Sequence, residues 1–258
     1  MAIRIKTPEE IQIMAEGGKK LARVKNALKE AVKAGVTAAD IEKLAMDLIH
    51  AEGAEASFAK VPGYSWATCI NVNEGLVHGI PSRDMIFKDG DLVSIDVGVY
   101  FKGFHTDTST SVGINLSPEN KKFLNIGQNA LEKAISEVKA GNYIYNISQA
   151  IESTTEGAGY TTIKALVGHG VGRELHEDPQ IPCFVPLASA RGKPGSVSDS
   201  PQITEGMVLA VEVMYAQGKD KVEVLEDGWT IAMTDGKIAG LFEETVAVTG
   251  KGALVLTR

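Results

Sequence analysis

The sequence predicts an α+β fold in which antiparallel strands form a curved sheet and helices cover one of its faces. Two observations support this prediction. Four segments with helical spacing of apolar residues come in two pairs, and strands follow each pair. A weak repeat relates the pairs at an offset of 106 residues, since VKAG at 32–35 recurs at 138–141. The 258 residues are therefore expected to form one domain with two similar halves, roughly 1–115 and 116–258.

The first helix pair has clear start signals. Thr7 and Glu10 form a capping-box pattern, which predicts a helix from residue 8 to a stop at Gly35. Thr37 opens a second helix that should close at Gly53.

The second helix pair follows the same plan. Ser117 and the proline after it start a helix that is expected to reach Gly141, and another helix is expected over residues 145–156. Strands should dominate from residue 161 to the end. Residues 188–200, which are polar and rich in Gly, Ser and Pro, are typical of a surface loop.

Residues 92–112 predict a β-hairpin at the centre of the chain. An alternating strand and a Thr- and Ser-rich return strand flank a two-residue turn at Lys102-Gly103. With that turn, Asp96 and Asp107 are diagonal neighbours on one face, roughly 7–8 Å apart at Cα. Two carboxylates so close repel each other unless a proton or a cation lies between them, and a divalent metal ion would resolve the conflict. The alternative is a pair of solvated aspartates on an open sheet face.

Two further acidic residues occur in strands near the C-terminus. Glu212 is the only charged residue in the apolar strand 207–216. A lone carboxylate in such a strand costs several kcal/mol unless it is paired, hydrogen-bonded or metal-bound. Glu243 lies where another strand begins, and a solvated edge position is its alternative.

Three of the five histidines stand among glycines, prolines and acids, where core packing does not explain them. They are His78, His169 and His176. Glycines on both sides of His169 would let the backbone approach a ligand closely, although a turn residue is the alternative for both His169 and His78. His50 ends a helix and His105 lies on the return strand of the hairpin, so neither is assigned a role. No HExxH, GxGxxG or P-loop pattern is present.

Taken in order, seven polar positions resemble those of type I methionine aminopeptidases, the "pita-bread" metallopeptidases. They are His78 in HGIP, Asp96 in SIDVG, Asp107 in TDTS, His169 in GHGVGR, His176 in ELHEDP, Glu212 in VEV and Glu243 in FEET. The resemblance runs over nearly the whole chain. It implies the pita-bread fold, with two pseudo-symmetric halves around a central site for two metal ions.

The resemblance also implies roles for these residues. The two divalent ions would be bound by Asp96, Asp107, His169, Glu212 and Glu243. Four carboxylates and one neutral imidazole balance two divalent ions and suit Mn, Fe, Co or Zn. A water bridging the ions would lose a proton and attack the carbonyl, with Glu212 as proton shuttle. His176 would donate to the developing oxyanion, and His78 would contact the scissile amide nitrogen or the second residue.

The resemblance assigns the methionine pocket as well. Its walls would be Tyr64, Cys69 and Trp229, with Phe58 nearby. Leu175 stands where many relatives have Phe, Val213 stands where Pro is usual, and the segment 188–200 is longer than in compact relatives. These departures concern the shape of the pocket and leave the metal ligands intact.

The predicted function is metal-dependent removal of the initiator methionine from nascent proteins, with a preference for a small second residue. The alternatives are a proline-specific (Xaa-Pro) peptidase and a non-catalytic binding module on the same scaffold. A net charge of −7 argues against a dedicated DNA-binding protein, and two cysteines do not form a disulfide framework. With no apolar run long enough for a signal peptide or a membrane span, we expect a cytoplasmic protein. We also expect a monomer, with a possible transient ribosome contact.

Overall fold

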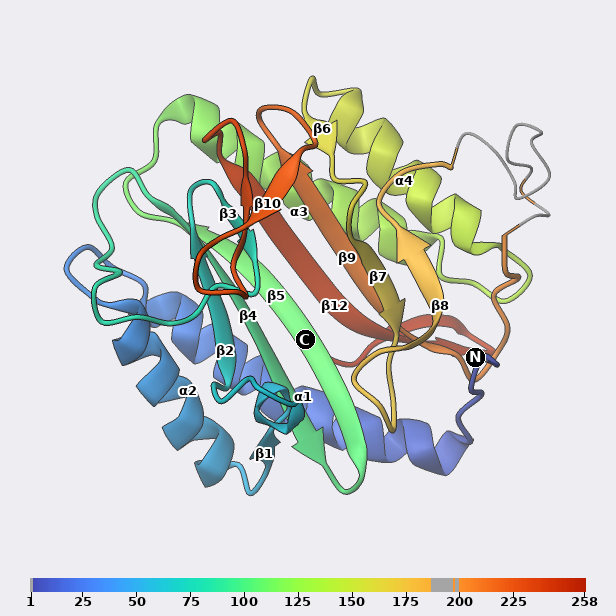
Figure 1. Cartoon of the computed structure of the whole chain (residues 1–258). Helices are drawn as coiled ribbons and strands as arrows, with labels where there is room; N and C mark the ends of the chain where they lie inside the picture. The colour runs from blue at the N-terminus through green and yellow to red at the C-terminus, as the bar shows by residue number, and fades with distance from the viewer. Residues whose placement is uncertain (1, 187–196, 198–199) are drawn as a thin grey trace.

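The computed structural model describes residues 2–186, 197 and 200–258, and within them ten strands form one antiparallel sheet (Figure 1). These strands are β1 (Glu55–Ala56), β2 (Thr68–Val72), β4 (Leu92–Phe101), β5 (Phe104–Gly113), β6 (Thr161–Thr162), β7 (Val167–Gly170), β8 (Glu177–Pro182), β9 (Val208–Ala216), β12 (Ala239–Thr249) and β13 (Gly252–Val255). The main order is β1-β4-β5-β12-β9-β7-β8, and β2, β6 and β13 pair with β4, β9 and β12. A smaller sheet contains β3 (Gly75–Val77), β10 (Val222–Val224) and β11 (Ile231–Met233). The predicted α+β class is confirmed.

The predicted helix starts agree with the structure, whereas two predicted helix ends are wrong. The helices are α1 (Pro8–Ala31), α2 (Ala38–Ala51), α3 (Pro118–Ser136) and α4 (Ile144–Glu156). The Thr7 side chain accepts a hydrogen bond from the Glu10 backbone N–H, as the capping-box pattern predicts. α1 and α3 end before Gly35 and Gly141 because those segments bond to distant backbone. The Gly35 N–H donates to the Phe87 carbonyl, and the Gly141 N–H donates to the Ile203 carbonyl, both at 2.9 Å.

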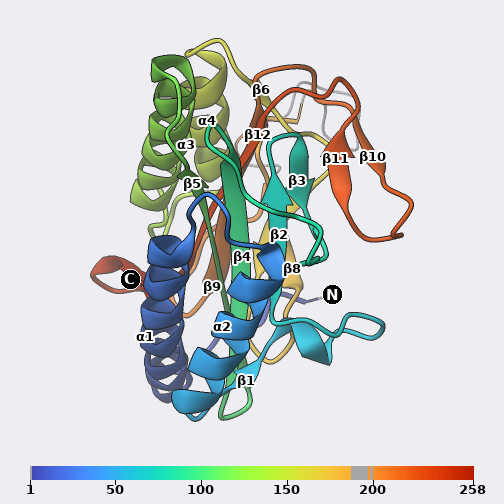
Figure 2. The ribbon, with the colours of Figure 1, turned by 90° about the vertical axis from the view of Figure 1, so that its left-hand side faces the viewer.

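Helices cover one face of the sheet, and the other face carries both polar and apolar residues. Val93, Ile95 and Val97 of β4 share a buried apolar cluster with α1 and α2. A second cluster joins β9 and β12 to α3 and α4. Figure 2 shows α1 and α3 on one side of the sheet and the β10–β11 hairpin on the other. Because side chains alternate along a strand, the polar positions of β4 project away from the helices.

The central hairpin has the predicted register. Phe101 pairs with Phe104 across the turn, and Asp96 pairs with Ser109. Both turn residues have positive φ, 48° at Lys102 and 91° at Gly103, which is the conformation of the mirror-image turns that join two twisted strands. The register places Asp96 and Asp107 on the same face of the sheet.

The two halves of the chain show matching backbone contacts. Thr37, before α2, forms an isolated bridge with Ile86, and Tyr143, before α4, forms one with Gln202. Thr37 and Tyr143 are 106 positions apart, which is the offset of the sequence repeat. β5 of the first half pairs with β12 of the second half.

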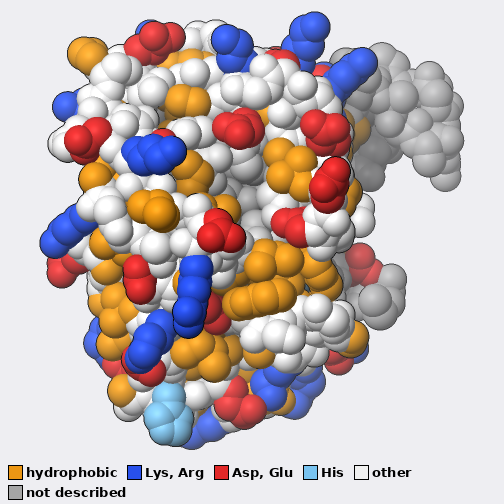
Figure 3. All heavy atoms as spheres, turned by 60° about the vertical axis from the view of Figure 1, so that its left-hand side comes forward, with side chains coloured by type: hydrophobic (Ala, Val, Ile, Leu, Met, Phe, Trp, Pro, Cys, Tyr) orange, Lys and Arg blue, Asp and Glu red, His pale blue; other side chains and the backbone are white. Residues whose placement is uncertain are grey.

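Three other sequence expectations concern the surface. Apart from residues 197 and 200, the segment 188–200 lies outside the described residues, so its prediction as a surface loop stays a prediction. Among the described residues, no helix has both the length and the apolar character that crossing a bilayer requires. On the face drawn in Figure 3, described basic and acidic side chains are interspersed and do not gather into one basic patch.

Candidate metal centre and substrate cavity

The face of the sheet opposite the helices carries a row of polar side chains across four neighbouring strands. Asp96 of β4 is paired with Ser109 of β5, and Ser109 is paired with Glu243 of β12. Glu243 is paired in turn with Glu212 of β9. Side chains of residues paired directly across antiparallel strands lie on the same face. The register therefore brings three acids from distant parts of the chain into one line.

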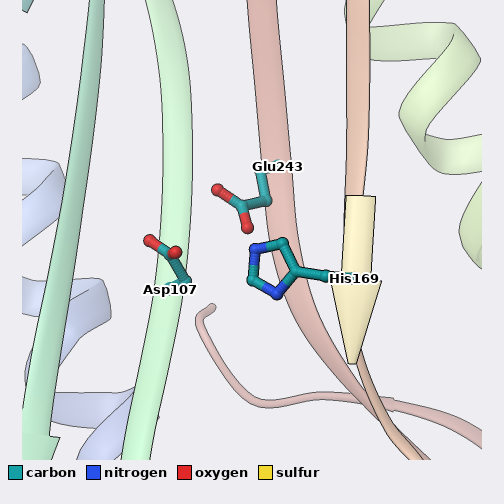
Figure 4. Close-up of side chains that lie close together, drawn as sticks. All are labelled: Asp107, His169 and Glu243. Atoms are coloured by element: carbon teal, nitrogen blue, oxygen red, sulfur yellow. The ribbon is translucent and has the colours of Figure 1, made fainter. Parts of the chain in front are cut away.

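Two more predicted ligands lie one step further along the same strands. Asp107 is two residues from Ser109 on β5, and His169 of β7 pairs with Ala210, which is two residues from Glu212. Figure 4 shows Asp107, His169 and Glu243 pointing toward one another from three strands. Each of these three residues offers one ligand atom, and the three atoms lie within 4.8 Å of one another. This spacing allows one cation to contact all three residues.

One cavity contains every site residue that the sequence analysis singled out. Its volume is about 130 Å³, and its lining consists of Phe58, Val61, Tyr64, Cys69, Val77, His78, Asp96, Asp107, His169, Leu175, His176, Glu212, Trp229 and Glu243. Val61 and Val77 were not predicted, because they have no chemical signature beyond being apolar. Ser109 was not predicted either: it does not line this cavity, but it lies between Asp96 and Glu243 in the strand register, and its buried hydroxyl has no hydrogen-bond partner among the described residues.

The negative charges of the four carboxylates in the cavity repel one another unless a cation lies between them. Burial raises the pKa of Asp96 well above its usual value, and the nearby charges of Asp107 and Glu212 raise it further. Burial also raises the pKa of Asp107 to about 7. The pKa values of Glu212 and Glu243 are raised by burial and by the charge of Asp107. Asp96 Oδ1 and Glu243 Oε1 are buried atoms without a hydrogen-bond partner among the described residues, which fits oxygen atoms that bind cations.

His169 presents a free nitrogen to this acidic group. Its Nδ1 lies 2.9 Å from the Gly170 carbonyl oxygen, and because a carbonyl only accepts, Nδ1 must carry the hydrogen. Nε2 is then unprotonated and lies 3.4 Å from Glu212 Oε1. Burial lowers the pKa of His169 to about 3, so the imidazole is neutral at physiological pH. A neutral imidazole whose other nitrogen donates to a carbonyl is the usual form of a metal ligand.

Two threonines hold Asp107 in place. The Asp107 N–H donates to Thr245 Oγ1 at 2.9 Å, and Thr245 Oγ1 donates to the Asp107 carbonyl at 2.7 Å. The Thr108 N–H donates to Asp107 Oδ1 at 2.9 Å. Backbone and carboxylate are therefore both fixed, and the Asp107 side chain also hydrogen-bonds to Asp96.

The two remaining histidines lie beside the acidic group. The rings of His169 and His176 have centroids 4.5 Å apart. Burial lowers the pKa of His176 and of His78, which favours the neutral imidazole at both positions. His78 has a positive φ of 59°, and a Cβ on the next residue, Gly79, would collide with the Ile70 carbonyl oxygen. Only glycine can follow His78 in this backbone path.

Aromatic and apolar side chains form the other wall of the cavity. The Tyr64 ring packs edge to face against Trp229, with centroids 5.1 Å apart, and its hydroxyl donates to the Thr68 carbonyl at 2.8 Å. Tyr64 also shares a buried apolar cluster with Phe58, Cys69 and Leu175. This wall suits an apolar side chain, while the acidic group on the opposite side suits cations.

Comparisons with known proteins agree over the whole chain. The profile of metallopeptidase family M24 matches residues 12–250. Methionine aminopeptidase 1 of Bacillus subtilis is 39% identical over 254 residues, which cover 98% of each chain. The chain belongs to metallopeptidase family M24. The resemblance that the sequence predicts is therefore confirmed, and so is the enzyme class of a metal-dependent aminopeptidase.

Solved structures place this M24 metallopeptidase within the pita-bread fold. The crystal structure of a methionine aminopeptidase from Thermotoga maritima superposes with a TM-score of 0.92 at 39% identity, and each chain is covered completely. A prolidase from Pyrococcus furiosus has a TM-score of 0.75 at 24% identity, and the match covers 98% of this chain but 65% of the prolidase. The likeness to the prolidase shows a shared fold alone. The predicted fold is confirmed.

Proposed function

We propose that this M24 enzyme hydrolyses the peptide bond after an N-terminal methionine and prefers a small second residue. One observation supports this most directly: an acidic, histidine-bearing group and an apolar wall share one cavity. Its volume of about 130 Å³ is close to the roughly 150 Å³ that accommodates one benzene molecule, so a single apolar side chain fits. The full-length match to proteins named methionine aminopeptidase supports methionine as that side chain.

The acidic group fits two divalent metal ions. The residues that would hold them are Asp96, Asp107, His169, Glu212 and Glu243. Their four carboxylates carry the charge that two divalent ions neutralise, and one nitrogen among oxygens suits Mn, Fe, Co or Zn. When bound, the ions supply Lewis acidity toward the substrate carbonyl and make water a stronger acid.

The chain's own residues supply the remaining steps. Glu212 accepts the proton of the attacking water and passes it on toward the departing amine. His176, neutral and beside His169, donates a hydrogen bond to the carbonyl oxygen as negative charge develops there. His78 contacts the scissile amide nitrogen or the second residue. Tyr64 and Trp229 hold the methionine side chain away from water.

The natural substrates in this proposal are the N-termini of nascent polypeptides. The enzyme would act in the cytoplasm as a monomer without DNA or membrane partners, and any ribosome contact would be transient. Residues 1–258 would form one catalytic unit whose halves, roughly 1–115 and 116–258, descend from one repeat. Asp96 and Asp107 come from the first half and the other three ligands from the second, which supports a single unit built around the metal site.

An assay on short peptides tests the proposal. The protein is stripped with a chelator, and one divalent ion at a time is added with Met-Ala-Ser as substrate. We expect release of free methionine only when an ion is present. Cleavage of Ala-Pro peptides in place of Met-Ala-Ser would favour the proline-specific alternative. Absence of both metal binding and cleavage would favour the binding module.

A further inference from the structure

A short loop carries two cavity residues into place. β7 ends at Gly170 and β8 begins at Glu177, so residues 171–176 must turn and also present Leu175 and His176 to the cavity. The loop contains Gly172, which allows many backbone conformations. Some other interaction must therefore select the one conformation that places His176 beside His169.

The Glu177 carboxylate is the group around which this loop folds. Its Oε1 accepts backbone hydrogen bonds from Arg173 at 2.9 Å and from Glu174 at 3.2 Å. Its Oε2 accepts a hydrogen bond from Lys6 Nζ at 2.6 Å. The side chains of Lys6 and Glu177 are only 4% and 3% exposed. One buried carboxylate thus fixes the loop at two positions just before His176.

Lys6 reaches this carboxylate from the opposite end of the chain. The Lys6 backbone N–H donates to the Gly206 carbonyl at 2.8 Å, which anchors the N-terminal segment beside the start of β9. A Cβ on Gly172 would collide with Lys6 Cε and would lie 3.0 Å from Glu177 Oε1. Glycine is therefore required at position 172, because any side chain there would occupy the space of the Lys6–Glu177 ion pair.

A buried ion pair is a poor way to gain stability, because removing two charges from water costs about as much as their attraction returns. In this protein, the Glu177 carboxylate of the ion pair also accepts hydrogen bonds from the backbone of the loop 171–176. The geometry points to the Lys6–Glu177 ion pair as a positioning element that sets the loop 171–176 and, through it, His176. This inference rests on the proposed function, since that function gives His176 its place at the substrate carbonyl.

Three variants, a double-mutant cycle and a control variant test the inference. In the metal-loaded enzyme with Met-Ala-Ser, we expect Glu177→Gln and Lys6→Met each to lower kcat about 10- to 100-fold, with bound metal per chain unchanged. Lys6→Arg, which keeps the charge, should recover most of the rate. In a His176→Ala background, Glu177→Gln should add less than about a twofold loss, because the group that it positions is gone.

Arg4→Met is the matched control, since Arg4 reaches the same carboxylate at 3.4 Å but is 46% exposed, and it should change kcat less than about twofold.

A second readout does not depend on catalysis. In the metal-free protein, the side-chain NMR signal of His176, assigned by its absence in His176→Ala, should move in Glu177→Gln and Lys6→Met while the His50 signal stays. Full additivity with His176→Ala, loss of metal or an unmoved His176 signal would overturn the inference. If Glu177→Gln fails to fold, the Lys6 variants carry the same test. If the wild-type enzyme does not cleave Met-Ala-Ser, the proposed function fails, whereas the NMR result still decides the positioning.

Discussion

Glu212 of β9 and Glu243 of β12 are direct cross-strand partners, and both carboxylates line the cavity. Like charges opposite one another destabilise a sheet, so such a pair persists only where its charge is neutralised. Among the described residues that line the cavity there is no Lys or Arg, and Asp107 raises the pKa of both glutamates further. The strand register itself thus creates a position where protons or bound cations must neutralise the carboxylates.

Asp107→Asn should abolish metal binding and peptide cleavage together. The amide is a weaker ligand and removes one of four negative charges from a site that must balance two divalent ions. Loss of the several kcal/mol that metal ions supply corresponds to at least about a 1,000-fold drop in kcat/KM. Metal content after dialysis and cleavage of Met-Ala-Ser measure the two effects. Asp89→Asn, on an exposed aspartate that contacts Asn115, is the control and should keep both properties. Full activity in Asp107→Asn would remove Asp107 from the ligands.

Without bound ions, the protein should lose stability as pH rises from about 4 to about 7. Burial raises the pKa of Asp107 in the folded state to about 7, against about 3.9 in an unfolded chain. Between these values the folded state holds a proton that the unfolded state has released. The contribution of this group is therefore complete below about pH 4 and falls by about 1.4 kcal/mol per pH unit until the pH reaches its folded pKa.

Thermal unfolding of the chelated protein across this pH range measures the effect. The Asp107→Asn variant lacks the titrating group, so its melting temperature should fall less steeply with pH than that of the wild type. Adding Mn²⁺ or Co²⁺ to the wild type at neutral pH should raise the melting temperature, because ions that bind the folded state stabilise it. Equal slopes for the wild type and the variant would contradict the assignment.

Local signals explain why much of the fold could be predicted from the sequence. The hairpin register depends on the turn at Lys102-Gly103 and on alternation in the strands, both visible within residues 92–112. The start of α1 depends on Thr7 and Glu10, three positions apart. The ends of α1 and α3 could not be predicted, because Gly35 and Gly141 bond to backbone far away in sequence.

In the candidate site, too, residues with a local sequence signal could be predicted and residues without one could not. Its charged residues stood out because a carboxylate such as Glu212 in an apolar strand needs a special partner. Ser109 lies in the same row between Asp96 and Glu243, but a serine on a strand carries no such signal. The Lys6–Glu177 contact joins residues 171 positions apart, and neither residue type nor spacing indicates it.

His78→Ala should lower turnover about 100-fold while the enzyme keeps its metal. His78 lines the cavity and belongs to none of the strands that carry the proposed ligands. Because His78 has a positive φ of 59°, Asn tolerates its backbone better than Ala, and His78→Asn separates loss of the imidazole from backbone strain. Single-turnover rates and metal content are the measurements, and His50→Ala, at the exposed end of α2, is the control. A variant that loses metal would move His78 to the ligands.

Leu175→Phe should make the enzyme stricter for methionine. Leu175 packs with Phe58, Tyr64 and Cys69 in the apolar wall of the cavity. A larger ring there narrows the space for the first side chain of the substrate, and it should exclude the branched side chain of leucine more than the flexible one of methionine. One or two methylene-sized contacts are worth about a tenfold change in discrimination.

The ratio of kcat/KM for Met-Ala-Ser to that for Leu-Ala-Ser measures this strictness, because the ratio cancels any change in metal loading or in the amount of folded enzyme. Leu254→Phe is a matched control, since Leu254 is an exposed leucine on β13 outside the cavity, and its ratio should equal that of the wild type. We expect the ratio to rise in Leu175→Phe while cleavage of Met-Ala-Ser changes little. If the ratio fell or stayed constant, the first side chain of the substrate would not bind against Leu175, and the assignment of this wall as the methionine pocket would be wrong.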